Sequence, residues 1–342
     1  MQSGKSQPLK PISSSEVAWT EWSDVPRFGV RYKHLTLATM GEGYHVGVSI
    51  EELPPGKQSS PQHFHIFEEE HLFILDGSLT LRLGEMRHEM KAGDYVCFPA
   101  GQKVGHCLIN TSGATCRYVI LGEHNPNEVV IYTDSRKVLV RALGRRALFD
   151  LDATRTYWDG EDTGLAEGEQ PPPDDAEAAE ERIEALPPIS SQSVEWIAEG
   201  EGTRFGGRSK RLTHAVFGNV YSVGVRIESP APGKRLAPTH YHMLEEEHAL
   251  VLEGQVTLIL GDERHEMAAG DYVCFPAGQR VGHSFLNSSD SPCSYLMIGQ
   301  RNPHEVCVYP DSNKMAVDAL QPGDSIFGMG EVRRYWDGEQ TT

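Results

Sequence analysis

Residues with the types and spacing of metal ligands occur twice in this chain of 342 residues. The first set is His63, His65, Glu70 and His106. The second set has the same spacing 177 positions later and consists of His240, His242, Glu247 and His283. Three neutral imidazoles and one carboxylate suit a divalent transition metal and leave positions open for water or substrate. The sequence therefore predicts two mononuclear metal sites rather than buried structural histidines, which are the alternative interpretation.

Strand geometry explains how the first set could meet. Residues i and i+2 of a β-strand point to one face, so His63 and His65 can direct both imidazoles to the same side. Glu70 begins an apolar run and can reach the same space from a neighbouring strand. His106 follows the turn Pro99-Ala100-Gly101 and supplies the third imidazole. We expect the second set to assemble in the same way.

Two stretches of each repeat resemble the two sequence motifs of the cupin superfamily. In the first repeat the first motif is represented by His63, His65, Glu70 and Gly77. The second motif is represented by Gly93, Pro99, Gly101, His106 and Asn110. Four residues separate the turn glycine from the histidine, two more than is usual in this motif. The resemblance covers residues 28–140 and 205–317, so the chain resembles a bicupin. It implies an all-β fold of two tandem cupin (double-stranded β-helix, or jelly-roll) barrels with ligands pointing inward.

The local pattern agrees with an all-β fold. Residues 45–50 alternate apolar and polar side chains, and residues 77–84 place leucines on one face between two glycines, as half-buried strands do. Residues 92–107 and 269–284 are identical at 14 of 16 positions, which indicates a duplicated barrel unit. Two such units are expected to pack about a pseudo-two-fold axis, as a homodimer of single barrels would, and homo-oligomers of the whole chain remain open.

Composition shifts divide the chain into four parts. We predict an N-terminal arm at 1–27, cupin domain 1 at 28–160, an acidic Pro-rich linker at 161–193, and cupin domain 2 at 194–342. Residues 1–16 are expected to be frayed and residues 17–27 to lie against the first barrel. Residues 174–186 of the linker form either one short helix or a solvated tether. The tails Tyr157-Trp158 and Tyr335-Trp336 are expected to pack on a barrel, because exposed tryptophans are uncommon.

Charge and cysteine content limit the classes of partner. The net charge is −18, and half of it lies in residues 161–185, which hold ten acids and one base. This balance argues against nucleic acid or an anionic membrane as partner and says little about the small-molecule substrate. The six cysteines form no Cys-x-x-Cys pair, the first 17 residues have no apolar core, and no stretch reaches transmembrane length. We therefore expect a cytoplasmic protein with reduced thiols.

Other polar residues beside the predicted ligands receive lesser roles. Glu69 and Glu246 compete with Glu70 and Glu247 as ligands, but the spacing to the following glycine favours the latter pair. The remaining acids of each run are expected to be turn residues in water: Glu68, Glu69, Glu245 and Glu246. His71 and His248 should face the opposite side of the sheet and act beside the ligands or at the surface. Gln102 and Gln279 either donate hydrogen bonds to substrate beside the metal or form the turn.

The ligand set does not select one metal. It accepts Fe, Mn, Zn, Ni or Cu, and the resemblance to cupins favours Fe or Mn, one ion in each domain. The resemblance implies a metal-dependent oxidoreductase, with dioxygenase chemistry on a small oxygen-rich substrate chelated to the metal. A non-oxidative isomerase or decarboxylase of a sugar or organic acid is the alternative, as is a metal-containing protein that binds a small ligand. Fold alone does not decide among these functions.

Overall fold

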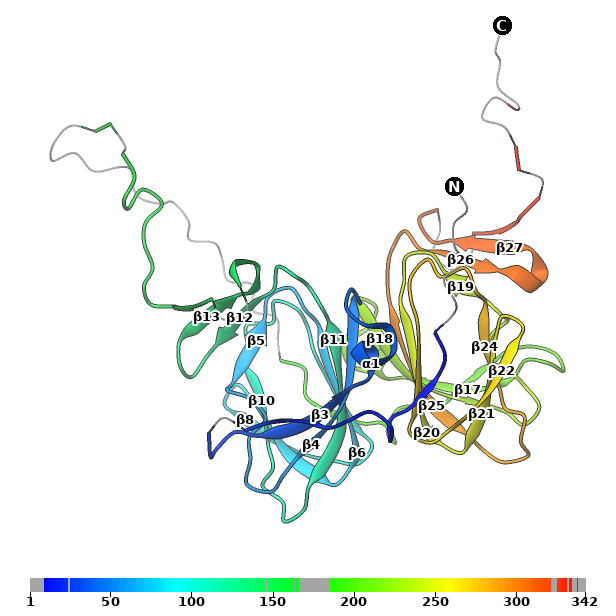
Figure 1. Ribbon diagram of the computed structural model, residues 1–342, viewed down its shortest axis with the longest axis horizontal. Coiled ribbons are helices and arrows are strands. Elements are labelled where there is room, and N and C mark those ends of the chain that lie inside the picture. The colour runs from blue at the N-terminus through cyan, green and yellow to red at the C-terminus, as the bar shows by residue number, and fades with distance from the viewer. Residues whose placement is uncertain are drawn as a thin grey trace, which may run out of the picture.

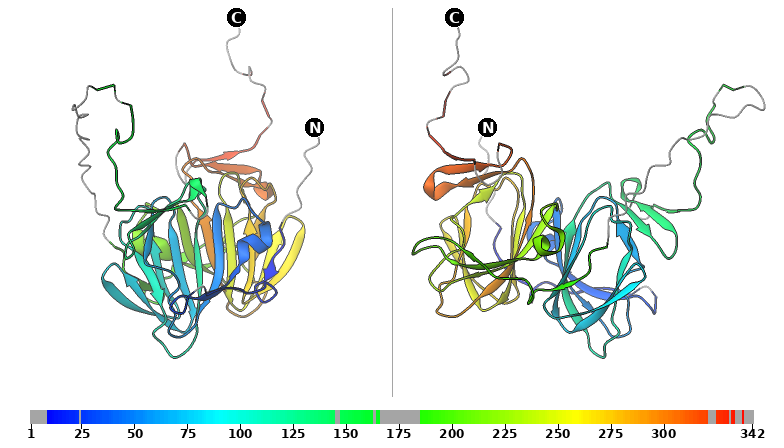
Figure 2. Two further views of the ribbon diagram at one scale, coloured as in Figure 1. Left: turned by 60° about the vertical axis from the view of Figure 1, so that its left-hand side comes forward. Right: turned by 180° about the vertical axis from the view of Figure 1, so that it is seen from behind.

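Two β-barrels of similar architecture lie side by side (Figure 1). The structure is a computed structural model, and it describes residues 9–23, 25–144, 147–162, 164–165, 185–320, 325–330, 332–333 and 337. Strands dominate these residues, so the predicted all-β fold of two tandem jelly-roll barrels is confirmed. Each barrel has one sheet that faces the other barrel, here called the interface sheet, and an outer sheet that faces away (Figure 2).

The first barrel consists of two seven-stranded sheets. Its interface sheet contains, in spatial order, β15 (Ile189–Ser190), β9 (Asp94–Phe98), β6 (Glu70–Asp76), β11 (Cys116–Glu123), β4 (Val46–Leu53), β3 (Val30–His34) and β2 (Thr20–Trp22). Its outer sheet contains β14 (Leu148–Asp150), β13 (Lys137–Val140), β12 (Val129–Tyr132), β5 (His63–His65), β10 (His106–Ile109), β7 (Ser78–Leu83) and β8 (Met86–Lys91).

The second barrel repeats this arrangement. Its interface sheet contains β1 (Ile12–Ser13), β23 (Asp271–Phe275), β20 (Glu247–Glu253), β25 (Ser294–Gln300), β18 (Val223–Pro230), β17 (Gly207–Arg211) and β16 (Ile197–Glu199). Its outer sheet has two parts, which are β19 (Tyr241–His242), β26 (Val306–Tyr309), β27 (Lys314–Val317) and β28 (Ile326–Gly328), and β22 (Glu263–Ala268), β21 (Gln255–Leu260) and β24 (His283–Leu286). The short helices among the described residues are α1 (Leu35–Met40), α2 (Leu212–Phe217) and the 3-10 turns η1 (Arg141–Leu143) and η2 (Pro310–Ser312).

Three apolar cores follow from the two-residue period of the strands. Leu79, Leu81 and Leu83 of β7 point into the first barrel and belong to its interior core. The second barrel has an equivalent interior core. Val46 and Val48 of β4 belong instead to a third core, which includes buried residues of both barrels. The interface sheets are therefore apolar on both faces, as expected for strands that are covered on both sides.

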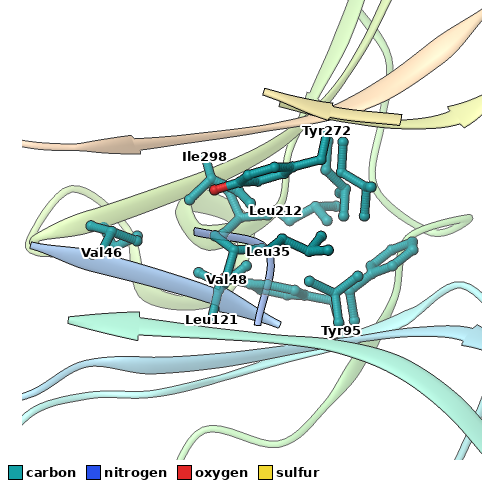
Figure 3. Packing of buried hydrophobic residues seen from close by; sticks show 14 of the residues in the cluster. Leu35, Val46, Val48, Tyr95, Leu121, Leu212, Tyr272 and Ile298 are labelled. Atoms are coloured by element: carbon teal, nitrogen blue, oxygen red, sulfur yellow. The ribbon is translucent and has the colours of Figure 1, made fainter. Parts of the chain in front are cut away.

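The third core joins the barrels face to face. Figure 3 shows Leu35 and Leu212, from the two short helices, packed between Tyr95 of the first barrel and Tyr272 of the second. All four side chains are at most 1% exposed. The chain thus buries a continuous apolar layer between its halves, and this layer is the main source of their association.

The segment that precedes each barrel in the sequence adds a short strand to the interface sheet of the other barrel. Strand β1 pairs with β23 of the second barrel, through Ile12 opposite Tyr272. Strand β15, from the end of the linker, pairs with β9 of the first barrel, through Ile189 opposite Tyr95. The prediction that residues 1–16 are frayed was therefore wrong for residues 12–14, because their backbone pairs with the far barrel. Residues 20–22 do lie on the first barrel, through β3.

Two glutamates anchor the barrels to each other. The carboxylate of Glu69 accepts hydrogen bonds from the backbone N–H groups of Ser222 and Val223, each at 3.0 Å. Glu246 accepts from those of His45 and Val46, at 2.9 and 3.0 Å. The prediction that these glutamates are turn residues in water was wrong, since both are at most 5% exposed. Their negative charge is stabilised by amides of the opposite barrel, which local sequence cannot reveal.

A hydrogen-bonded chain crosses the interface beside each anchor. His71 contacts the hydroxyl of Tyr95 at 2.7 Å, and this hydroxyl shares a 2.7 Å hydrogen bond with Thr213 of the other barrel. The repeat-related chain runs through His248 and Tyr272 to Thr36. Both histidines face away from the barrel interior, as predicted, but they are fully buried rather than at the surface.

The remaining predictions about the chain concern its periphery. The tail residues Tyr157 and Trp158 are 75% and 38% exposed and contact each other, so the expected packing of this tail on a barrel was wrong. Tyr335-Trp336 and most of the predicted linker helix lie outside the described residues. All six cysteines are buried and free of disulfides. Within the described part of the chain, no helix has the length and apolarity that a membrane crossing requires.

The interface contacts of Glu69 lead to a prediction about the free energy of unfolding. Glu69→Ala should lower the free energy of unfolding in urea by about 2–4 kcal/mol, because two backbone N–H groups of the second barrel lose their charged partner. Glu85→Ala is the matched control, since the side chain of Glu85 is 95% exposed. Equal urea midpoints for both variants and the parent protein would contradict this role of Glu69.

Candidate metal centres

Both sheets of a barrel contribute to each cluster of predicted ligands. In the first barrel, His63 and His65 lie on β5 and His106 lies opposite His63 on the adjacent β10, all in the outer sheet. Glu70 begins β6 of the interface sheet. An ion held by these four residues would therefore connect the two sheets. The two additional residues before His106 do not displace it, because the register of β10 brings its ring to the cluster.

In the first barrel all four predicted ligands come together. One ligand atom from each of His63, His65, Glu70 and His106 lies within 4.8 Å of the others. The closest pair is His106 Nε2 and Glu70 Oε2, at 2.8 Å. The ring of His106 is stacked on Phe98, with 3.8 Å between ring centroids. This stacking fixes the plane of the imidazole.

The second barrel gathers the equivalent residues around one carboxylate oxygen. Glu247 Oε2 lies 2.9 Å from His283 Nε2, 3.3 Å from His242 Nε2 and 3.6 Å from His240 Nε2. His283 is stacked on Phe275 in the same way as its counterpart in the first barrel. The same four positions therefore converge in both halves of the chain.

Neighbouring groups orient the histidine rings. His63 Nδ1 lies 2.9 Å from the carbonyl oxygen of Pro61, and His240 Nδ1 lies 2.8 Å from that of Pro238. A ring that donates from Nδ1 to a carbonyl keeps the lone pair of Nε2 for a metal ion. Within the described residues, the buried Nε2 atoms of His65 and His242 make no hydrogen bond, whereas their Nδ1 atoms face the carboxylates of Glu128 and Glu305. Such buried Nε2 atoms fit a site that is completed by a metal ion.

Two further glutamates support the clusters, and sequence reasoning assigned them no role. Glu128 Oε1 lies 3.5 Å from His65 Nδ1, and its carboxylate also accepts the backbone N–H groups of Ile66 and Phe67. Glu305 lies 3.4 Å from His242 Nδ1 in the second barrel. Their recurrence in the repeated Asn-Pro-x-Glu sequence, outside the motifs, was the signal that could have identified them.

The candidate carboxylate ligands are ionised. Burial alone would raise the pKa of Glu70, but the hydrogen bond from His106 and the nearby imidazoles lower this pKa to about 2. Burial also opposes the charge on Glu247, but His242 with its neighbouring histidines holds the pKa of Glu247 well below its usual range. Each cluster therefore offers a negative charge to a divalent ion at neutral pH.

The histidines differ in their proton affinity. Burial lowers the pKa of His63 to about 3 and that of His283 to about 4, so both rings are neutral and able to bind a metal. Burial also opposes the charge on His65 and His242, but Glu128 beside His65 and Glu247 beside His242 outweigh it. The pKa of His65 is raised, and the pKa of His242 is raised to about 11. The ring of His242 must therefore lose a proton before it can bind a metal.

One cysteine lies beside the second cluster, and the two predicted turn glutamines lie outside the cavities that adjoin the clusters. Cys307 lies opposite His242 across the strand pair and close enough to His240 and His242 to share an ion, whereas the first barrel has Val130 at this position. Gln102 and Gln279 form the predicted turn, with backbone hydrogen bonds to Pro99 and Pro276. Neither glutamine lines the cavities beside the clusters.

A cavity adjoins each cluster. In the first barrel a cavity of about 210 Å³ is bordered by His63, Glu70 and His106. In the second barrel a cavity of about 370 Å³ is bordered by His242 and Glu247. Both volumes accommodate a small organic molecule rather than a polymer.

Comparison with known proteins supports the repeat and its fold. The domain model described as "Cupin domain" matches residues 49–122 and 226–299. Quercetin 2,3-dioxygenase of Bacillus subtilis (strain 168) is 29% identical over 148 residues, which are 38% of this chain and 43% of that protein. The match thus spans less than half the length of this curated relative.

Solved structures resemble the whole two-barrel arrangement. The putative glyoxylate-induced protein of Pseudomonas aeruginosa has a TM-score of 0.58 at 17% identity, over 89% of this chain and 93% of that one. The oxalate decarboxylase–formate complex of Lactobacillus farciminis has a TM-score of 0.54 at 17% identity, over 90% and 89% of the two chains. At this identity the likeness concerns the fold. The domain model matches each barrel across the strands that carry the candidate ligands, so each barrel contains a cupin domain and the chain is a tandem of two, a bicupin.

Proposed function

We propose that this bicupin is a metal-dependent oxidoreductase that acts, as a dioxygenase, on a small oxygen-rich organic substrate. The observation that carries the proposal is the convergence of three histidines and one ionised glutamate on one point in both barrels. Buried ring nitrogens without partners and a cavity beside each cluster support it further.

The chain's own residues would prepare each centre. The ligands would be His63, His65, Glu70 and His106 in the first barrel and His240, His242, Glu247 and His283 in the second. Carbonyl groups orient one imidazole in each barrel, and a phenylalanine ring holds another. Leu72, Leu108 and Ile120 line the first cavity and exclude water from the substrate. Preorganised ligands of this kind reduce the reorganisation that the reaction requires.

The bound ion would supply Lewis acidity and an anchor for oxygen donors of the substrate and for dioxygen. We favour Fe or Mn, and the ligand types also admit Zn, Ni or Cu. The likeness to a quercetin dioxygenase supports the oxidative form of the proposal.

Non-oxidative conversion of an organic acid, such as decarboxylation, is the second candidate. The observation that favours it is the presence of Arg211, Arg226 and Arg301 around the cavity of the second barrel, since guanidinium groups bind carboxylates. A metal-containing protein that binds a small ligand without converting it would share the same centres.

Metal content tests the ligand assignment. His63→Ala and His240→Ala should each lower the bound metal by about half, because the other barrel keeps its site, and the double variant should bind almost none. Elemental analysis of the purified proteins measures this. His88→Ala, a histidine on β8 away from the cluster, should retain the full amount. Full metal in the double variant would refute the assignment.

Metal uptake should release protons. The pKa of His242 is raised to about 11, so this ring carries a proton at neutral pH, and a metal ion needs the lone pair that this proton occupies. We expect release of about one proton for the ion bound in the second barrel at pH 7 and weaker binding there as the pH falls. Calorimetric titration in buffers of different ionisation enthalpy measures the release. Complete uptake with no proton release would contradict this protonation state.

Oxygen consumption distinguishes the two enzymatic candidates. The iron- or manganese-loaded protein is offered quercetin, a catechol, a diketone and a hydroxy acid in an oxygen electrode. Carbon dioxide release from oxalate is followed in parallel. Oxygen uptake that is absent from the His63→Ala/His240→Ala variant supports the oxidative proposal. Carbon dioxide release without oxygen uptake favours the second candidate, and a metal-loaded protein that does neither contradicts both.

A further inference from the structure

The two barrels differ at one strand position that faces the candidate metal centre. Arg226 lies on β18 of the second barrel, and the equivalent residue on β4 of the first barrel is Ser49. Val225 and Ile227, on either side of Arg226, belong to the core between the barrels. Because neighbouring residues of a strand face opposite sides, Arg226 points into the second barrel. Its side chain is 43% exposed and borders the cavity there.

Local contacts hold this guanidinium beside the candidate ligand. Arg226 Nε lies 2.8 Å from Glu228 Oε1, and Glu228 also accepts a 2.8 Å hydrogen bond from the Tyr295 hydroxyl. Arg226 and Glu247 border the same two cavities. The charges of Glu228 and Glu247 outweigh burial and raise the pKa of Arg226, which stays a cation.

The cavity beside the first cluster offers no such group, and Arg141, which stands where the second barrel has Asp318, is paired with Glu68. Among the described residues that line its 210 Å³ cavity there is no lysine or arginine, and its polar members include Glu51 and Ser59. The corresponding space in the second barrel shrinks to about 30 Å³. There Leu236 replaces Ser59 and Phe285 replaces Leu108, in addition to the arginine. The cavities beside the two candidate metal centres are therefore not equivalent.

Two more arginines distinguish the larger cavity of the second barrel. Arg211 and Arg301 border it, where the first barrel has His34 and His124. In the first barrel these two histidines pack on Tyr44, with ring centroids 5.1 and 4.9 Å away. Carboxylates also line the cavity of the second barrel and are Glu245, Glu247 and Asp318. A divalent ion on Glu247 would neutralise that carboxylate and leave the arginines to attract an anion.

We propose that the second barrel binds a carboxylate-bearing ligand, whose carboxylate is held by Arg226 beside the metal, and that the first barrel takes a ligand without a carboxylate. The inference rests on the proposed metal-dependent function and assigns different ligands to its two centres. A guanidinium binds a carboxylate through paired, charge-assisted hydrogen bonds. At the same place the first barrel presents the hydroxyl of Ser49 and the carboxyl of Glu51, which would repel an anion when ionised.

Calorimetric titration of the metal-loaded full chain with glycolate tests the proposal, with glycolamide as the uncharged probe of the same shape. The parent protein should bind about one equivalent of glycolate in its tighter class. Arg226→Ser should weaken that class by about 10- to 100-fold and leave glycolamide binding unchanged. Arg226→Lys should bind glycolate with intermediate affinity, because lysine keeps the positive charge but cannot form the paired hydrogen bonds of a guanidinium. Arg226→Ser should fold, since the first barrel already combines a serine and a glutamate at the matching positions.

Arg264→Ser is the matched control, because it removes the same charge from the exposed strand β22 of the same barrel. Unchanged glycolate affinity in Arg226→Ser would overturn the proposal, as would loss of the tighter class in His63→Ala instead. Elemental analysis of the metal in every sample distinguishes a failure of this proposal from a failure of the proposed function. If the parent protein bound no metal, the proposed function would fail, and glycolate binding to the metal-free chain would still have to depend on Arg226.

Discussion

The reciprocal contacts of Glu69 and Glu246 with the opposite barrel are the constraint on which the arrangement of the molecule depends. Apolar packing brings the interface sheets together but does not select one register, whereas a buried carboxylate must find N–H donors at fixed positions. Each anchor directly precedes a candidate metal ligand, Glu70 or Glu247. Since each anchor lies just before β6 or β20 and each ligand begins that strand, the start of one strand positions both the neighbouring barrel and the centre inside its own barrel.

The candidate centres could be predicted because their geometry is local. His63 and His65 share a strand face by periodicity alone. The recurrence of all four residues at one offset of 177 positions argued against a chance pattern. The all-β fold followed for the same reason, since residues 45–50 and 77–84 show the alternation of half-buried strands that the structure contains as β4 and β7. The third imidazole, His106, was assigned from the turn before it and from its recurrence as His283, because nothing local pairs β10 with β5.

What sequence reasoning missed depends on contacts between distant segments. An acidic run such as Glu68 to Glu70 is typical of a solvated turn. The burial of Glu69 follows from amides some 150 residues away, and that of Glu68 from Asn125 and Arg141. Glu128 orients His65 from the position before β12, beyond both motifs. Residues 12–14 lie in a polar segment that appears frayed, and they pair with a strand edge of the far barrel. Pairing partners of short strands are rarely encoded nearby.

Both ends of the linker lie on the first barrel. The chain leaves the first barrel after β14 and returns to the same barrel at β15 before it enters the second. The intervening peptide thus begins and ends on one barrel, and the contacts between the barrels described above are made by residues outside it. Closing a longer loop costs little additional free energy. A change in chain length between residues 162 and 185 would leave these contacts in place, so an added domain could be accepted there.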